Sequence, residues 1–118
     1  MKKHFLIVTL FAVLIFAACS KKTSPGKTVP EPPKTNYTAD VLPLIQMKCA
    51  PCHLPSKGGN KTSFENYLSA QKVATEMVLR IERNPAEKGF MPFRQPAKLS
   101  ADEIAVFKKW VSDGLLEK

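Results

Sequence analysis

The chain has few of the side chains that usually bind metal ions or form disulfide bonds. Among its 118 residues there are only three cysteines and two histidines. Cys19 and His4 lie near the N-terminus, which leaves Cys49, Cys52 and His53 as one small group. A structural zinc site needs about four such ligands. The sequence therefore disfavours zinc at this group.

Strand patterns are also missing. No alternation of strands and helices surrounds Cys49 and Cys52, and this disfavours a thioredoxin-like dithiol centre, which occurs beside a βαβ unit. Residues 37–118 instead carry three or four segments with helical spacing of apolar residues. We therefore expect an all-α domain.

No apolar run is long enough to make a membrane-spanning helix the favoured interpretation. Residues 5–18 are almost purely apolar, but they number fewer than the roughly 20 that a transmembrane helix needs. Because basic residues precede this run and small residues end it, residues 1–18 are typical of a secretory signal peptide. Cys19 follows at once, as in bacterial lipoprotein signals, although Phe16 stands where leucine is commoner. We expect lipid on Cys19, anchoring an exported protein to a bacterial membrane, in the periplasm or elsewhere outside the cytoplasm.

The strongest pattern is C-x-x-C-H, formed by residues 49–53. Two thiols at this spacing lie on one turn of the chain, so both can reach the vinyl groups at one edge of a haem. His53 then lies where an imidazole nitrogen can bind the iron axially. The motif predicts one haem c, attached covalently through Cys49 and Cys52, with His53 as the proximal ligand. With Cys19 assigned to lipid, a Cys49–Cys52 disulfide in an exported dithiol protein is the remaining alternative.

Three methionines could supply the second axial ligand once the signal peptide is removed. Met47 stands beside the haem cysteines on the same helix, and Met77 falls on the apolar stripe of a middle helix. Met91 lies between two helices in the segment 89–93, which contains Gly and Pro, and loops are where ligands are usually presented. We predict Met91 as the distal iron ligand. The alternative for a loop methionine is gap-filling packing.

The first two helical stretches surround the haem motif. The first leads into it, and Pro43 is tolerated because it falls in a first turn. The second is expected to begin at Thr62 or Ser63, since Thr62-x-x-Glu65 has the form of a capping box. A break near 69–72 divides this stretch.

The last helical stretch has the clearest boundaries. Ser100-x-x-Glu103 forms a capping box, and Gly114 is placed to end the helix. A domain of about eighty residues buries only a thin core, so we expect the haem to supply part of it. One apolar stripe lies along this helix, formed by Ile104, Phe107, Trp110 and Val111.

Residues 20–36 have the composition of a linker. They contain four prolines and several lysines, and Val29 is the only large apolar side chain. With polyproline character at about 3.1 Å per residue, they would reach roughly 50 Å. They are either a spacer or a disordered tail without functional length. The expected division is a signal peptide over 1–18, a lipidated cysteine and linker over 19–36, and a haem domain over 37–118.

This order of parts resembles the class I monohaem cytochrome c family, and in detail the short bacterial domains of the lipoprotein type. The resemblance covers essentially residues 37–114. It implies a small domain of three to four helices wrapped around one covalently bound haem. The matching pieces are Tyr37-x-x-Asp40-Val41-x-Pro43, the C-x-x-C-H motif, Lys57-Gly58-Gly59, Phe90-Met91-Pro92, Leu99-Ser100-x-x-Glu103-Ile104 and Trp110-Val111-x-x-Gly114.

The family pattern implies further contacts. The first and last helices would cross, bringing Leu44 and Ile45 against Phe107 and Trp110, and His53 and Met91 would be the axial ligands. Many relatives carry a Gly-Pro after the haem histidine, and that proline carbonyl accepts a hydrogen bond from the imidazole. This chain departs from the pattern, since only Pro55 is available and it lies closer to the motif than expected.

Closed coordination by histidine and methionine favours electron transfer. Such an iron has no open site for oxygen or peroxide, and methionine raises its potential relative to two histidines. We expect a carrier of single electrons between periplasmic or membrane-bound redox proteins, neither an enzyme nor a binder of a small-molecule substrate. One alternative is a haem domain with an open or displaceable sixth site, acting as a sensor or enzyme subunit. Another is a fixed subunit of a larger oxidoreductase.

The charge of the chain bears on its partner. The formal net charge of +8 becomes +6 when Lys2 and Lys3 leave with the signal peptide. Lys48, Lys57 and Lys61 flank the motif, where they either steer the haem edge to an acidic partner surface or form an ordinary solvated face. Export and the absence of a basic stripe with aromatic residues argue against nucleic acid. We expect a monomer.

Overall fold

A computed structural model describes residues 31–93 and 98–118. The expected signal peptide, Cys19 and most of the linker lie outside these residues. The described part has helices and no strand, apart from an isolated bridge between Asn36 and Leu116, and this confirms the expected all-α class. None of its helices combines the length and the apolar character needed to cross a membrane.

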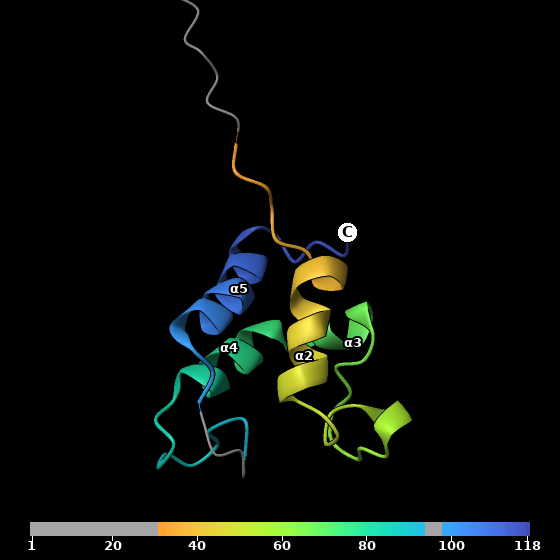
Figure 1. Ribbon diagram of the computed structural model, residues 1–118, viewed down its shortest axis with the longest axis vertical. Helices are drawn as coiled ribbons and strands as arrows, with labels where there is room; N and C mark the ends of the chain where they lie inside the picture. Colours follow the sequence, from red (N-terminus) through yellow and green to blue (C-terminus); the bar gives the residue numbers. More distant parts are fainter. Residues whose placement is uncertain (1–30, 94–97) are drawn as a thin grey trace, which may run out of the picture. The chain divides into compact units, whose positions relative to one another are not determined.

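The elements follow one another in a short chain of helices, shown in Figure 1. Four α-helices are described, together with a π-helical turn and one turn of 3-10 helix. In order, they are η1 (Tyr37–Val41), α2 (Leu42–Lys48), η2 (Pro55–Lys57), α3 (Tyr67–Lys72), α4 (Ala74–Glu82) and α5 (Ala101–Ser112).

The first helical segment is η1 continued directly by α2. The side chain of Asn36 caps it by accepting a hydrogen bond from the N–H of Ala39 at 2.8 Å. Pro43 falls in the first turn of α2, as expected. The helix ends at Lys48, so Cys49 is the residue that caps it and the C-x-x-C-H motif begins at the helix end.

The second helical stretch begins later than the sequence suggested. Asn66 is the capping residue of α3, and its side chain accepts from the N–H of Ser69 at 3.0 Å. The expected start at Thr62 or Ser63 is therefore wrong. The predicted capping-box glutamate, Glu65, instead accepts a hydrogen bond from the N–H of Ser56 at 3.1 Å. The break between α3 and α4 falls at Val73, one residue beyond the expected range.

The helix α5 has the expected boundaries. Its capping box is complete, since the N–H of Glu103 donates to Ser100 Oγ at 3.1 Å and the N–H of Ser100 donates to Glu103 Oε2 at 2.8 Å. Asp113 is its C-terminal cap. Gly114 follows at a φ of 95°, a left-handed conformation that costs glycine little.

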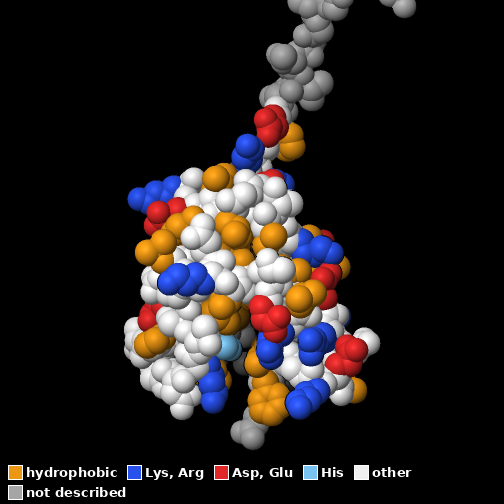
Figure 2. All heavy atoms as spheres, turned by 180° about the vertical axis from the view of Figure 1, so that it is seen from behind, with side chains coloured by type: hydrophobic (Ala, Val, Ile, Leu, Met, Phe, Trp, Pro, Cys, Tyr) orange, Lys and Arg blue, Asp and Glu red, His pale blue; other side chains and the backbone are white. Residues whose placement is uncertain are grey.

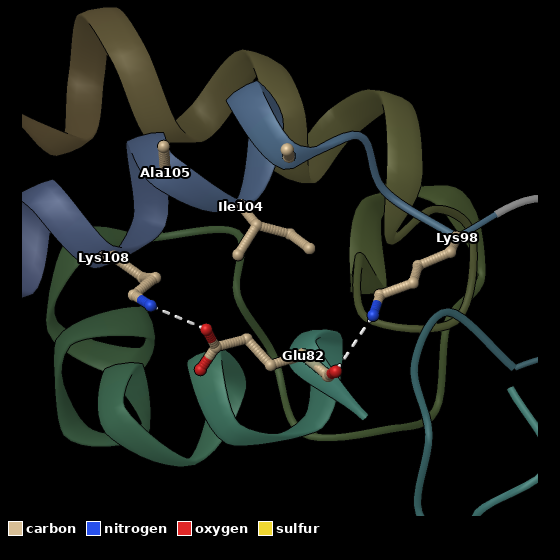
Figure 3. Close-up of a pocket in the computed structure, with 6 residues that line it drawn as sticks. Glu82, Lys98, Ile104, Ala105 and Lys108 are labelled. Atoms are coloured by element: carbon tan, nitrogen blue, oxygen red, sulfur yellow. Dashed lines mark hydrogen bonds and ion pairs between the residues drawn. The ribbon is translucent and has the colours of Figure 1, made fainter. Parts of the chain in front are cut away.

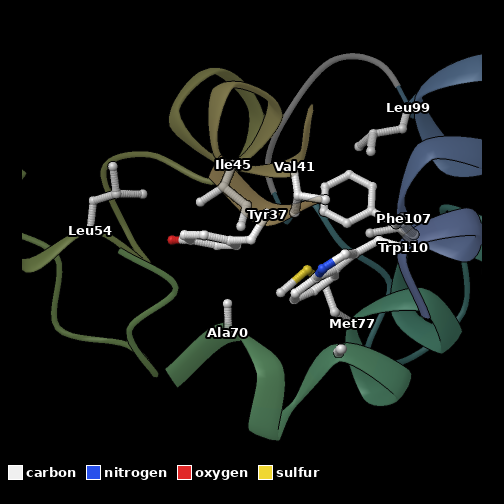
Figure 4. Close-up of a cluster of buried hydrophobic side chains, with 11 residues drawn as sticks. Tyr37, Val41, Ile45, Leu54, Ala70, Met77, Leu99, Phe107 and Trp110 are labelled. Carbon is white, nitrogen blue, oxygen red and sulfur yellow. The ribbon is translucent and has the colours of Figure 1, made fainter. Parts of the chain in front are cut away.

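The core joins the first and last helical segments. Figure 4 shows side chains from both pointing into one cluster, which also receives residues of α3 and α4. The rings of Tyr37 and Trp110 lie 5.8 Å apart, and Ile45, Phe107 and Trp110 are buried in the same cluster. Leu44 packs against it from the edge. Full burial stabilises such side chains by about 1.5–3 kcal/mol each, so this cluster fixes how α2 lies against α5.

The two ends of the domain differ in structure. At one end the N–H of Tyr37 donates to the carbonyl of Leu116 at 2.8 Å, and the N–H of Thr35 donates to Asp113 Oδ2 at 2.6 Å. Thr35 is buried, so the last residues of the segment expected as linker lie against the domain. The loops formed by residues 49–66 and 83–93 lie at the other end of α2 (Figure 1).

Candidate haem site

The turn over residues 49–53 gathers the two cysteines and the histidine. It continues from α2, since the N–H of Cys49 donates to the carbonyl of Ile45 at 2.9 Å and that of His53 donates to the carbonyl of Cys49 at 3.1 Å. Leu54 follows, and its side chain is only 1% exposed, so it anchors the turn in the core. The C-x-x-C-H residues are therefore held by the helix before them and a buried side chain after them.

Both cysteines of this turn are free thiols in the structure, but their surroundings differ. Cys52 is exposed to solvent, whereas Cys49 is half-buried and packs against the core. Desolvation by burial raises the pKa of the Cys49 thiol to about 11. Cys49 is therefore protonated at neutral pH in this state, and its reactivity as a thiolate is suppressed.

The loop that follows folds back onto the turn. The N–H of Lys61 donates to the carbonyl of Cys52 and that of Phe64 donates to the carbonyl of His53, each at 3.0 Å. Gly59 makes this approach possible, because a Cβ there would lie 2.1 Å from the carbonyl oxygen of Pro51. The loop thus wraps around the histidine.

The orientation of His53 is set by a backbone carbonyl in this loop. His53 Nδ1 lies 2.7 Å from the carbonyl oxygen of Thr62. A carbonyl oxygen can only accept, so Nδ1 carries the hydrogen, and in the neutral imidazole the lone pair is then on Nε2. This is the tautomer that an axial ligand needs. The acceptor is Thr62, and the sequence-based candidate Pro55 is wrong.

A second contact to His53 was also absent from the sequence-based interpretation. The Phe64 ring stacks on the imidazole, with centroids 4.0 Å apart and planes inclined by 5°. Neither Phe64 nor the Thr62 carbonyl has a sequence signature of its own. The sequence signal for this loop was the pair Gly58 and Gly59, since two glycines after the C-x-x-C-H motif permit a tight return of the chain.

The methionines occupy three different environments. Met77 is 5% exposed and belongs to the core cluster, whereas Met47 is 65% exposed on α2. Met91 is half-buried in the loop after α4. Its N–H donates to the carbonyl of Arg80 at 3.2 Å, and its neighbours Phe90 and Pro92 are buried. The loop is therefore fixed on both sides of Met91.

The structure brings the predicted ligand segments to one end of the domain. Residues 49–66 and the loop with Met91 both extend beyond the C-terminal end of α2 (Figure 1). Seen from behind, this end has a hollow, with hydrophobic side chains and a histidine at its edge (Figure 2). This histidine is His53, because the described residues contain no other histidine.

The donor set fits a haem better than a metal ion held by side chains alone. Residues 31–93 and 98–118 contain no group of three or more His, Cys, Asp and Glu side chains that could hold a metal ion. A haem needs less from the protein, since its macrocycle supplies four ligands and axial side chains complete the set. The free Nε2 of His53 and the two adjacent thiols match that need.

Among the three lysines around the motif, Lys48 forms an ion pair. Lys48 Nζ lies 2.9 Å from Glu103 Oε1, which ties the end of α2 to the first turn of α5. The hydrogen bond from Lys48, with that from the backbone of Ser100, holds the pKa of Glu103 below its usual range. Lys57 and Lys61 are exposed.

A cavity lies away from the motif, between α4 and α5 (Figure 3). It has a volume of about 430 Å³. Glu82 crosses its rim, accepting from Lys98 Nζ through its carbonyl at 2.9 Å and from Lys108 Nζ through Oε1 at 2.7 Å. These contacts hold α4 to α5, and the cavity brings no cysteine or histidine together.

Comparison with known proteins adds no relative to this chain. No protein-family model, no curated protein and no solved structure matches it.

Proposed function

We propose that the chain is a c-type cytochrome of the class I monohaem kind, with one haem attached to Cys49 and Cys52 and ligated by His53. The observation that carries this proposal is the hydrogen bond between His53 Nδ1 and the Thr62 carbonyl. In the neutral imidazole it leaves Nε2 with its lone pair on the residue directly after the two thiols.

Met91 is the distal ligand in this proposal. Its support is the contrast among the methionines, because Met77 is committed to the core and Met47 projects from the exposed side of α2. Met91 alone lies on a loop, and that loop, residues 83–93, is at the same end of the domain as the motif (Figure 1). Anchoring by Phe90 and Pro92 would hold its thioether with little freedom.

When bound, a haem supplies a one-electron iron couple. His53 and Met91 would hold the iron and leave no position for a further ligand, which would suit a carrier of electrons between redox proteins. The tether is part of the proposal: lipid on Cys19 would keep the domain at a membrane surface outside the cytoplasm.

The test compares ligand variants by optical spectroscopy of the mature protein. The ferric wild type is expected to show the charge-transfer band of methionine-sulfur ligation, and Met91→Ala to lose it. Met77→Leu is the matched control, since it removes a methionine with little change in volume and is expected to keep the band. A wild type with high-spin ferric haem would instead support the open-site alternative. A wild type without covalent haem would refute the proposal.

The anchor is tested separately by cell fractionation. Cys19→Ser is expected to move the protein from the membrane fraction to the soluble fraction, because the lipid attachment site is lost. If the variant stays in the membrane fraction, the lipid proposal is wrong and the apolar segment itself acts as the anchor.

A further inference from the structure

Two contacts of different kinds converge on the His53 imidazole. The Thr62 carbonyl accepts from Nδ1 at 2.7 Å, which fixes the edge of the ring that faces the loop. The Phe64 ring covers one face of the imidazole, with planes only 5° apart. The hydrogen bond alone would still allow the ring plane to tilt about the Nδ1···O direction. The stack opposes that tilt, because a flat neighbour 4.0 Å away fills the space into which the ring would turn.

Phe64 is itself fixed to the core through its backbone. Its N–H donates to the carbonyl of His53 at 3.0 Å, and its carbonyl accepts from the Tyr37 hydroxyl at 2.7 Å. Tyr37 is 3% exposed, and its ring lies 5.8 Å from that of Trp110. The stacked Phe64 ring therefore holds the imidazole in a fixed position relative to the core.

We propose that Phe64 is a positioning residue that sets the plane of the His53 imidazole and thereby tunes the iron; this rests on the proposed haem function. The p orbital of an axial imidazole overlaps with the iron d orbitals to an extent that depends on the orientation of the ring plane. Outer contacts that orient a ligand in this way tune the metal site. Phe64 thus acts through His53 and not by touching the iron.

The test uses Phe64→Leu and Phe64→Tyr in the haem-loaded protein. Leucine fills much of the same apolar space but offers no flat face, whereas tyrosine keeps the ring. Phe64→Leu is expected to shift the principal g values of the ferric protein in electron paramagnetic resonance, together with the reduction potential. Phe64→Tyr is expected to restore both toward wild type. If Phe64→Leu does not accumulate, Phe64→Met replaces it as the variant without a ring.

Tyr67→Phe is the matched control. Its hydroxyl donates to the carbonyl of Leu115 at 2.8 Å and accepts from Gln71 Nε2 at 2.6 Å, so the variant removes hydrogen bonds that involve neither His53 nor Phe64 and keeps the ring beside Tyr37. Its g values are expected to match wild type. The proposal is overturned if Phe64→Leu keeps the wild-type g values and potential, or if Tyr67→Phe shifts them equally. Failure of the proposed function would be seen earlier and differently, as a wild type that carries no covalent low-spin haem.

Discussion

A Cβ atom on Gly59 would lie 2.1 Å from the carbonyl oxygen of Pro51 and 2.6 Å from that of Cys52. Both atoms belong to the backbone of the C-x-x-C-H turn, so neither can move aside as the end of a flexible side chain could. The return of the loop over the turn thus depends on glycine at this position. The carbonyl of Thr62 reaches His53 through the same return.

Gly59→Ala is therefore expected to be much more damaging than Gly58→Ala. At Gly58 a Cβ would meet nothing within 4 Å, and only the φ of 81° is unfavourable, at about 1–2 kcal/mol. At Gly59 the backbone itself must shift, and overpacking of this kind reaches about 3 kcal/mol. Denaturant unfolding of the two variants measures the difference. Equal midpoints would show that the loop does not pack on the turn as described.

The two capping boxes expected from the sequence had different outcomes. Capping at Ser100 and Glu103 was predicted correctly, because both partners of a capping box lie within one turn and the signal is local. The second capping box at Thr62 was wrong, although its pattern is equally good. There the backbone is held by a longer-range contact, the Thr62 carbonyl with His53, and the helix starts only after Asn66.

The surroundings of the candidate site were less predictable than the C-x-x-C-H motif itself. The C-x-x-C-H spacing is a property of five consecutive residues, whereas a backbone carbonyl that receives His53 carries no residue type that could announce it. Lys48 was grouped with Lys57 and Lys61 as a lysine that either steers a partner or forms a solvated face, yet it pairs with Glu103 at 2.9 Å. That pair depends on how α2 meets α5, which periodicity alone does not determine.

The two thiols of the motif are expected to react at different rates in the haem-free protein. Cys52 is exposed, whereas Cys49 is half-buried with a pKa of about 11, so little thiolate is present there at neutral pH. Alkylation with iodoacetamide followed by mass spectrometry should therefore label Cys52 first. Raising the pH toward 11 should narrow the difference. Preferential labelling of Cys49 at pH 7 would contradict the burial described for it.

The final prediction concerns acid stability at the end of the domain remote from the motif. Hydrogen bonds from Lys109 and from the backbone N–H of Thr35 hold the pKa of Asp113 below its usual range. A carboxyl with a depressed folded-state pKa takes up its proton more readily in the unfolded chain. Its stabilising contribution is complete above the unfolded value of about 3.9 and disappears as pH falls through the folded value.

Asp113→Asn is therefore expected to be less stable than wild type at pH 7 and to converge with it as pH falls through the folded-state pKa of Asp113. Asparagine keeps an oxygen that can accept from the N–H of Thr35, so the change in the free energy of unfolding reports the effect of the charge alone. Lys109→Met removes the ammonium from the other side and should reduce the same pH-dependent difference. Added salt should shrink it as well, since this pair lies at the surface. Thermal unfolding across pH 2–8 measures these curves for the three proteins.

The acid sensitivity left in Asp113→Asn is then expected from Glu103, whose pKa is also held below its usual range, by Lys48. If wild type and Asp113→Asn instead differ by a constant amount at every pH, the interaction does not depend on the charge of Asp113, and the contact with Thr35 is an ordinary neutral hydrogen bond.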